Sequence, residues 1–209
     1  MAATNRVLIL FAHPALEKSR VHRSLIRGLD ALEGVTFHDL YETYPDLHIN
    51  VAREQELLRN HDVVVLQHPF YWYSAPAIVK EWQDLVLEYG FAYGENGSAL
   101  SGKKLISAIS TGGPADSYQA QGFNRFTIRQ LLLPFEQTAH LCGMEYLPPF
   151  VIHGTHKLSD PEIDSHAADY LRVILGLRDG QADWAKARDW PHLNLDLSAI
   201  FDSPLASHA

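Results

Sequence analysis

The segment VVVLQHPFYWYSAPAIVKEW, residues 63–82, decides the fold, because it predicts a strand, a turn and a helix in that order. Residues 63–66 form a continuous apolar run, which is typical of a strand buried on both faces of its sheet. After the turn, Ile78, Val79 and Trp82 fall on one face of a helix that opens with Pro76. A buried strand followed by an amphipathic helix is the repeating unit of a parallel sheet covered by helices.

The same alternation of strands and helices continues along the chain. Apolar runs predict further strands at residues 7–11, 35–37, 105–110 and 150–152. Helix-period patterns predict helices at 21–32, 52–60, 125–142 with a break at Pro134, and 160–177. We therefore expect one α/β domain over residues 1–177, built on five parallel strands. Residues 178–209 have little periodicity and predict an irregular C-terminal extension.

Size, charge and composition bound the class of protein. A chain of 209 residues with 46% hydrophobic and 20% charged residues fits one soluble domain. Its net charge of −8 argues against nucleic-acid binding, which needs a basic surface. No apolar run approaches the roughly 20 residues that span a bilayer, and MAATNRVLILFAHP at the start lacks a signal-peptide cleavage site. With Cys142 as its single cysteine, we expect a cytoplasmic protein without disulfides, in which Cys142 is a small core residue.

Three loops hold the least generic residues of the chain, and each follows a predicted strand. They cover residues 12–19, 68–74 and 111–118. In an open parallel sheet, ligands bind outside the carboxyl ends of the strands, near the point where the strand order reverses. We therefore expect these three loops to meet at one ligand site.

The first loop has neither the G-x-G-x-x-G pattern of dinucleotide-binding folds nor the phosphate loop of nucleotide hydrolases. It offers His13, Ser19 and Arg20 near the start of a helix instead. Ser19 is placed as an N-cap, and the free N–H groups of a first helical turn favour an anion such as phosphate. The alternative is that Ser19 only caps the helix and that His13 lies on the surface.

The second loop places Phe70, Tyr71, Trp72 and Tyr73 in a turn, where small polar residues are usual. Tyrosine and tryptophan rings give a flat apolar wall with polar edges, which suits a planar heterocycle. The alternative is that the rings pack between the sheet and the helix, as we expect for Trp82.

The third loop, STGGP at residues 110–114, ends a strand with two glycines. Without side chains at Gly112 and Gly113, the backbone can approach a ligand closely and offer its N–H groups. Such donors suit an isoalloxazine ring, because reduction leaves negative charge near N1 and O2 that fixed dipoles stabilise. Together, the three loops predict a site for a flavin.

The segments HPFYWYSAPAIVKEW, FAYG at 91–94 and STGG at 110–113 resemble the flavodoxin-like NAD(P)H:quinone oxidoreductases, a family that includes DT-diaphorase. The resemblance runs from about residue 5 to residue 177. The chain length, YPD at 44–46 and LPPF at 147–150 are most similar to the ancillary proteins of glutathione-gated potassium efflux systems. The resemblance implies a flavodoxin-like three-layer sandwich with a five-stranded parallel sheet in the order 2-1-3-4-5.

The family also implies a homodimer that binds FMN, with FAD as the second choice, and that uses NAD(P)H to reduce a quinone. Residues 1–177 would then be the flavin-binding domain. By their match to the family's motifs, the residues expected around the cofactor are His13, Ser19, Arg20, Val21, His22, Phe70, Tyr71, Trp72, Tyr73, Ser110, Thr111, Gly112, Gly113 and Tyr118.

Three residues are expected near the reacting groups. Tyr118 matches a tyrosine that in relatives hydrogen-bonds near the pyrimidine edge of the flavin, and Tyr93 matches one that lines the substrate pocket from the partner subunit. Asn124 is a departure, because relatives carry a histidine there that helps to balance charge during hydride transfer. Asparagine cannot accept a proton near neutral pH, which puts this proton relay in question but leaves hydride transfer possible.

Other roles remain open from the sequence. The chain could be a regulatory subunit of a glutathione-gated potassium efflux antiporter at the inner face of the membrane, with the flavin as a structural or sensing element. It could also be a one-electron flavodoxin-type carrier. No metal site is expected, since no carboxylate or cysteine near His153 and His156, the closest histidine pair, completes a ligand set.

Overall fold

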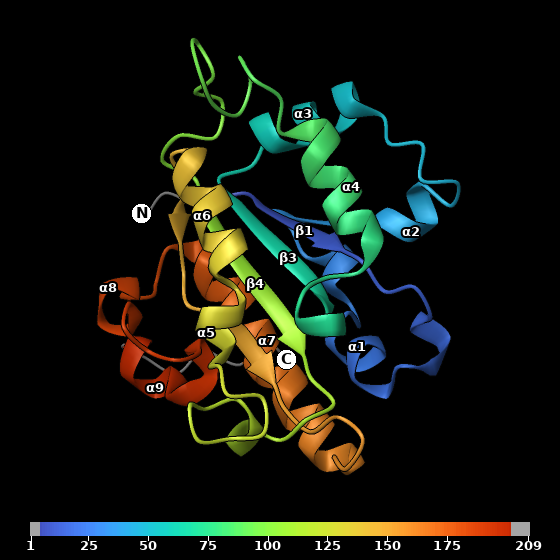
Figure 1. Cartoon of the computed structure of the whole chain (residues 1–209), viewed down its shortest axis with the longest axis vertical. Helices are drawn as coiled ribbons and strands as arrows, with labels where there is room; N and C mark the ends of the chain where they lie inside the picture. Colours follow the sequence, from blue (N-terminus) through green and yellow to red (C-terminus); the bar gives the residue numbers. More distant parts are fainter. Residues whose placement is uncertain (1–4, 202–209) are drawn as a thin grey trace.

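The computed structural model describes residues 5–201 and has three layers, with one parallel sheet between two sets of helices (Figure 1). Across the sheet the strand order is β2-β1-β3-β4-β5, and β6 also pairs with β4. The predicted flavodoxin-like α/β fold and its strand order are confirmed. The strands are β1 (Val7–Phe11), β2 (Val35–Asp39), β3 (Val63–Pro69), β4 (Lys104–Ser110), β5 (Glu145–Tyr146) and β6 (Phe150–Ile152).

The last position in the sheet is occupied by two short strands instead of one. β5 pairs with the first two residues of β4, and β6 pairs with the last three. Pro148 and Pro149 lie between β5 and β6, and a proline has no N–H to donate to a neighbouring strand. β6 therefore ends level with β4 and brings the loop that follows it to the same end of the sheet.

Helices cover both faces of the sheet. α1 (Arg20–Leu25) and α7 (Asp160–Asp179) pack together on one face, while α3 (Val51–Arg59), α4 (Ala77–Val86) and α6 (Leu133–Leu141) cover the other (Figure 1). Alternate residues of β1 point to opposite faces, so that Leu8 and Leu10 belong to the core under α4 and Val7 and Ile9 to the core under α7. The shorter helices are α2 (Leu40–Thr43), α5 (Ile128–Leu131), α8 (Trp184–Ala187) and α9 (Leu197–Ile200).

The predicted helices are present, but the first is shorter than its pattern predicts. α1 ends at Leu25, Gly28 adopts a left-handed backbone with a φ of 78°, and a single 3-10 turn follows at Leu29–Ala31. Leu29 is still buried on the face that the pattern predicts. The break at Pro134 is confirmed, because Pro134 lies in the first turn of α6, directly after α5.

Residues 180–201, here called the C-terminal segment, pack against β6 and α7. The side-chain amide of Asn194 accepts a hydrogen bond from the N–H of Val151 at 3.0 Å and donates one to its carbonyl at 2.8 Å, as a neighbouring strand would. Phe201 lies against Gly176, where an added Cβ would be 2.1 Å from the Phe201 ring. The C-terminal segment thus covers part of the outer edge of β6, which could otherwise pair with another chain.

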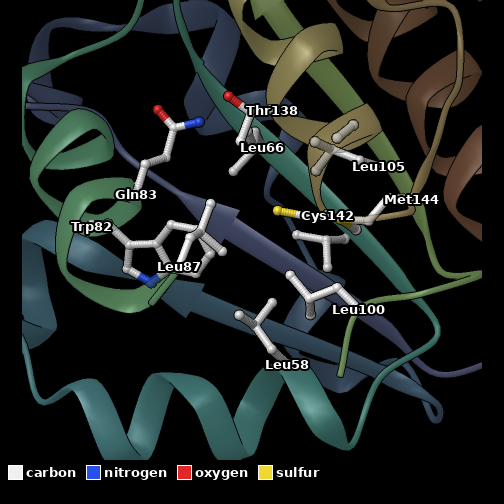
Figure 2. A pocket seen from close by; sticks show the side chains of 12 residues that line it. Leu58, Leu66, Trp82, Gln83, Leu87, Leu100, Leu105, Thr138, Cys142 and Met144 are labelled. Atoms are coloured by element: carbon white, nitrogen blue, oxygen red, sulfur yellow. The ribbon is translucent and has the colours of Figure 1, made fainter. Parts of the chain in front are cut away.

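A small apolar cavity of about 20 Å³ lies in the core between α4, α6 and the sheet (Figure 2). Trp82, Leu100 and Met144 are among its walls, together with Cys142, a free and buried cysteine. Burial raises the pKa of the Cys142 thiol, which keeps the thiol protonated and unreactive. The cavity is a packing gap of the core and lies away from the loops at the carboxyl ends of the strands.

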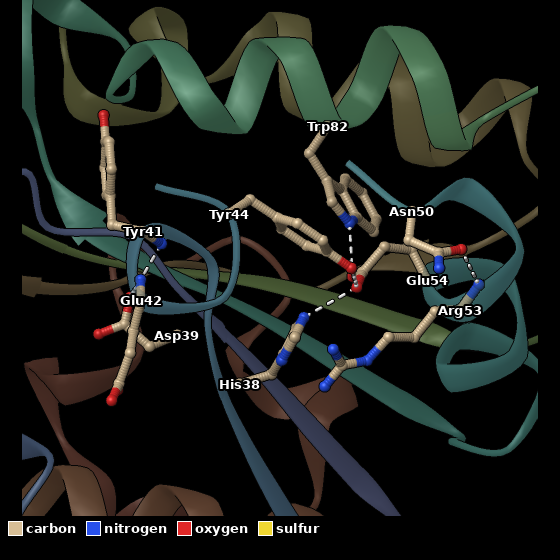
Figure 3. Close-up of polar contacts among 9 residues, drawn as sticks. All are labelled: His38, Asp39, Tyr41, Glu42, Tyr44, Asn50, Arg53, Glu54 and Trp82. Atoms are coloured by element: carbon tan, nitrogen blue, oxygen red, sulfur yellow. Dashed lines mark hydrogen bonds and ion pairs between the residues drawn. The ribbon is translucent and has the colours of Figure 1, made fainter. Parts of the chain in front are cut away.

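A buried carboxylate connects α4 to the β2 side of the sheet (Figure 3). Glu54 on α3 accepts hydrogen bonds from the indole N–H of Trp82 at 2.9 Å and from the hydroxyl of Tyr44 at 2.5 Å. Nε2 of His38, at the end of β2, lies 2.9 Å from the same carboxylate. Trp82 belongs to α4, the helix that follows residues 70–73, here called the aromatic turn. This network therefore anchors α4 to the sheet.

Candidate functional site

The loops after β1, β3 and β4 enclose a hollow of about 410 Å³ at the carboxyl ends of these strands, here called the first hollow. This is the end of a parallel sheet at which ligands bind. Much of the wall consists of residues expected around a cofactor, namely His13, Ser19, Arg20, Val21, Phe70, Tyr71, Ser110 and Gly112. The three loops predicted to meet at one site therefore do so.

One end of the first hollow is basic and polar. Lys18 brings positive charge to it, and Arg20 also lines it, with its guanidinium paired to the carboxylate of Asp160 at the start of α7. Ser19 caps α1 by accepting a hydrogen bond from the N–H of His22 at 3.1 Å. This end suits an anionic group such as a phosphate.

Two histidines lie between the first and third loops. His22 is 1% exposed, and its Nε2 lies 2.8 Å from Oγ of Ser110. Burial, together with the nearby rings of His13 and His68, holds the pKa of His22 well below its ordinary value. Burial also lowers the pKa of His13, whose Nδ1 accepts a hydrogen bond from the N–H of Ala15 at 3.2 Å. Both rings are therefore neutral at neutral pH and add no charge to the first hollow.

Some rings of the aromatic turn line the first hollow, and others lie on the surface. Phe70 and Tyr71 line the hollow, and Tyr71 lies edge-on to His13 with 6.3 Å between ring centroids. Trp72 does not line it, because this side chain is 93% exposed. Trp72 and Tyr73 have left-handed φ angles of 50° and 62°. Such a backbone costs a residue other than glycine about 1–2 kcal/mol, and strain of this kind concentrates at functional sites.

The third loop presents its backbone to the first hollow at Gly112. Behind it, the buried Thr111 receives a hydrogen bond on its carbonyl from the loop after β6, and its hydroxyl donates to the carbonyl of Gly113 at 2.8 Å. A Cβ added at Gly112 would lie 2.9 Å from Nε2 of His156. The absence of a side chain therefore lets the loop pass close to His156, which also lines the first hollow.

The sequence does not predict the fourth loop of the site, residues 153–157, which follows β6. Thr155 and His156 line the first hollow, and the N–H groups of residues 154–155 donate to third-loop carbonyls at 2.9 and 3.1 Å. A signal was available, because this loop also follows a strand of the same parallel sheet. Among residues 5–201, no group of three histidine, cysteine or acidic side chains is arranged to hold a metal ion.

The three residues expected near the reacting groups lie outside the first hollow. The hydroxyl of Tyr73 donates to Oδ1 of Asn124 at 3.1 Å, which joins the second loop to the segment that follows the third loop. Tyr118 lies beside Phe70, with 6.3 Å between ring centroids, and burial raises the pKa of the Tyr118 hydroxyl. Tyr93 lies in the loop between α4 and β4, and it does not line the first hollow.

The sequence matches a family model described as a flavodoxin-like fold over residues 5–174. It is 46% identical over 170 residues to the glutathione-regulated potassium-efflux system ancillary protein KefG of Serratia proteamaculans (strain 568). That match covers 81% of this chain and 93% of the relative.

Two solved structures are also similar. General stress protein 14 of Treponema denticola, solved in complex with FMN, is 40% identical with a TM-score of 0.77, over 82% of this chain and 99% of that one. An NADPH-quinone reductase from P. pentosaceus is 35% identical with a TM-score of 0.74, over 80% of this chain and 96% of that one. The family model, the relatives and the strand order agree, and the chain therefore belongs to the flavodoxin-like family.

Proposed function

We propose that this protein is a flavin-dependent NAD(P)H:quinone oxidoreductase, which binds FMN and passes two electrons from NAD(P)H to a quinone. The observation that carries the proposal is the first hollow, where Lys18 and Arg20, the neutral His13, and the rings of Phe70 and Tyr71 meet at the carboxyl ends of three strands. The similar structures named as an FMN complex and as an NADPH-quinone reductase support it.

The residues of the first hollow fit FMN. Its volume of about 410 Å³ lies within the range of small-molecule sites. Lys18, Ser19 and Arg20 would hold the phosphate, because they combine positive charge with a hydroxyl group. Phe70 and Tyr71 would contact the ring, and the backbone at Gly112 could approach it closely.

When bound, FMN supplies the hydride chemistry, and the chain supplies position and electrostatics. The N–H groups of the third loop beside Gly112 would stabilise negative charge at the edge of the ring. Tyr118 would keep its hydroxyl proton, because burial raises its pKa, and could donate a hydrogen bond. Asn124, held by Tyr73, can exchange hydrogen bonds but cannot take up a proton near neutral pH.

The test begins with the purified protein. We expect a yellow protein from which chromatography recovers FMN. In the absence of air, NADH or NADPH should bleach its visible absorbance, and a quinone should restore it. If NAD(P)H and the quinone occupy the same binding site in turn, double-reciprocal plots of rate against substrate concentration should give parallel lines. Intersecting lines would contradict the shared binding site, and a colourless protein that takes up neither FMN nor FAD would contradict the function.

We also propose that the protein acts as a homodimer, with Tyr93 reaching the substrate pocket of the partner subunit. Large apolar side chains on the surface support this, since Trp72 is 93% exposed, Phe123 89% and Phe126 54%. A second copy would remove such rings from water. Light scattering on the purified protein should give the mass of two chains, and Phe123→Ser should shift it toward one.

A second role is favoured by the relative named as a potassium-efflux ancillary protein. In that role the protein would be cytoplasmic and would bind a membrane antiporter of this class at its inner face. Among residues 5–201, no helix has the length and the apolar character needed to cross a bilayer. Co-purification with the antiporter, and activation of transport by a variant without reductase activity, would establish the regulatory role.

A further inference from the structure

A second hollow, of about 370 Å³, lies on the other side of the third loop. Its walls include Tyr118 from that loop, Ile128 and Arg129 from α5, His153 from the loop after β6, and Pro191 and His192 from the C-terminal segment. Pro191 and His192 lie beyond residues 5–174, over which the family model matches. The second hollow is therefore completed by a part of the chain that the family model does not include.

The hydrogen bonds of Thr111 favour one tautomer of His153. The Thr111 hydroxyl lies 2.8 Å from the carbonyl of Gly113, which can only accept, so the single hydroxyl proton is used there. Nδ1 of His153 lies 3.1 Å from the same hydroxyl oxygen, and with that hydroxyl proton in use it pairs best as the donor. The lone pair of the neutral ring is left on Nε2, which has no hydrogen-bond partner among residues 5–201.

The surroundings of His153 keep its ring neutral. Burial first, and then the nearby His192 and His166, lower its pKa to about 4. The ring of His153 lies 5.6 Å from that of Tyr118 and 6.0 Å from that of His192, measured between centroids. At neutral pH the second hollow therefore presents the neutral imidazole of His153 among aromatic and apolar walls, beside His192, whose pKa is also lowered by burial.

The charged groups at the second hollow do not favour an ionic ligand. The guanidinium of Arg129 donates to the carbonyls of Arg188 and Trp190 at 2.7 and 3.2 Å, and it also lies 3.7 Å from Glu136. The guanidinium of Arg129 is thus engaged by two backbone carbonyls and a nearby carboxylate of the protein, and not by the second hollow. The carboxylate of Asp189, which also lines the hollow, opposes an anion. A neutral molecule fits these walls best.

We propose that the second hollow binds a neutral aromatic molecule with a hydroxyl group, which packs against Tyr118 and Pro191 and donates its hydroxyl proton to Nε2 of His153. The site is separate from the first hollow, so the inference goes beyond the proposed function and does not need a bound flavin.

The test uses β-naphthol and its methyl ether as a matched pair, because they share a ring system but only the first has a proton to donate. Calorimetry on the purified full chain should show β-naphthol binding about tenfold more tightly than the ether, which is the effect of one hydrogen bond to a buried acceptor. This comparison needs no variant. Equal binding of the two compounds, or binding of neither, would overturn the proposal.

Two variants then locate the acceptor. His153→Phe keeps an aromatic ring without Nε2, and it should abolish the difference between β-naphthol and its ether, whereas His48→Phe at an exposed position should preserve it. Nitrogen chemical shifts of the His153 ring should show the proton on Nδ1 in the unaltered protein, and Thr111→Val should remove that preference. An unchanged difference in His153→Phe, or a proton on Nε2, would refute the assignment.

Discussion

The hydroxyl of Tyr73 donates a hydrogen bond to Oδ1 of Asn124 at 3.1 Å, and this contact joins the aromatic turn to the loop that follows Tyr118. Tyr73 makes it from a left-handed backbone with a φ of 62°. Because the amide oxygen of Asn124 accepts from Tyr73, the amide nitrogen is left to act as a donor. The position at which relatives are expected to carry a histidine thus holds an oriented donor that cannot titrate.

Asn124→His should retain bound flavin and raise the turnover of quinone reduction, because an imidazole can accept and release a proton at this place. The rate should also gain a pH dependence with a midpoint of about 6.5, the ordinary pKa of histidine. The measurement is kcat for NAD(P)H-dependent quinone reduction across pH, with flavin content determined in parallel. Asn124→Gln, which keeps an amide, is the matched control and should keep the original profile. Identical profiles in both variants would mean that residue 124 takes no part in proton transfer.

Gly112→Val should abolish flavin binding, because Gly112 lines the first hollow and packs closely against His156. Already a Cβ at this position would lie 2.9 Å from Nε2 of His156, and the two further methyl groups would block the approach of a ring to the backbone. Visible absorbance of the purified variant measures the loss. Ala185→Val adds the same two methyl groups at an exposed position of α8 and should leave the colour unchanged. Stoichiometric flavin in the Gly112 variant would refute the role given to this glycine.

The arrangement of the strands and loops could be predicted because it depends on patterns that are local in the sequence. The apolar runs at 7–11 and 63–66 mark strands buried on both faces, and the parallel topology then brings the loops after them to one end. The early end of α1 could not be predicted in this way. Its apolar period continues to Leu29, and the left-handed backbone at Gly28 interrupts the helix without changing the buried face.

The direction in which each side chain points could not be predicted from the sequence. Phe70 and Trp72 are equally aromatic, yet the first is 8% exposed and the second 93%, because successive left-handed residues turn the chain outward at that point. The loop after β6 was also missed as part of the site. The strand before it was predicted at residues 150–152, but the loop itself has no glycine pair or aromatic cluster to mark it, although it contributes Thr155 and His156 to the first hollow.

Glu54→Gln should destabilise the protein by about 2–4 kcal/mol, because a buried carboxylate with several partners loses its charge and some of its hydrogen bonds. Burial tends to raise the pKa of Glu54, but His38 and Tyr44 outweigh it and hold the pKa below its ordinary value. A carboxyl group with a lowered pKa in the folded state stabilises the fold above its unfolded pKa. That contribution is lost as the pH falls through the folded pKa.

Urea unfolding at a series of pH values measures this effect. The difference in free energy of unfolding between the original protein and Glu54→Gln should be largest near neutral pH and should shrink as the solution becomes acidic. Glu81→Gln, at an exposed position of α4, is the control and should change the free energy of unfolding by no more than about 0.5 kcal/mol. A difference that stays constant down to acidic pH would contradict a charged Glu54.

Asn194→Ala should loosen the edge of the sheet, because the N–H and the carbonyl of Val151 would both lose their partners. We expect a loss of about 1–3 kcal/mol in the free energy of unfolding and faster amide exchange at Val151. Asn60→Ala removes an amide that bonds only to Glu56 on the surface and should have little effect on either measurement. Equal losses of stability in the two variants, or unchanged exchange at Val151, would mean that the C-terminal segment does not protect the edge of β6. Other contacts would then have to hold Pro191 and His192 in the wall of the second hollow.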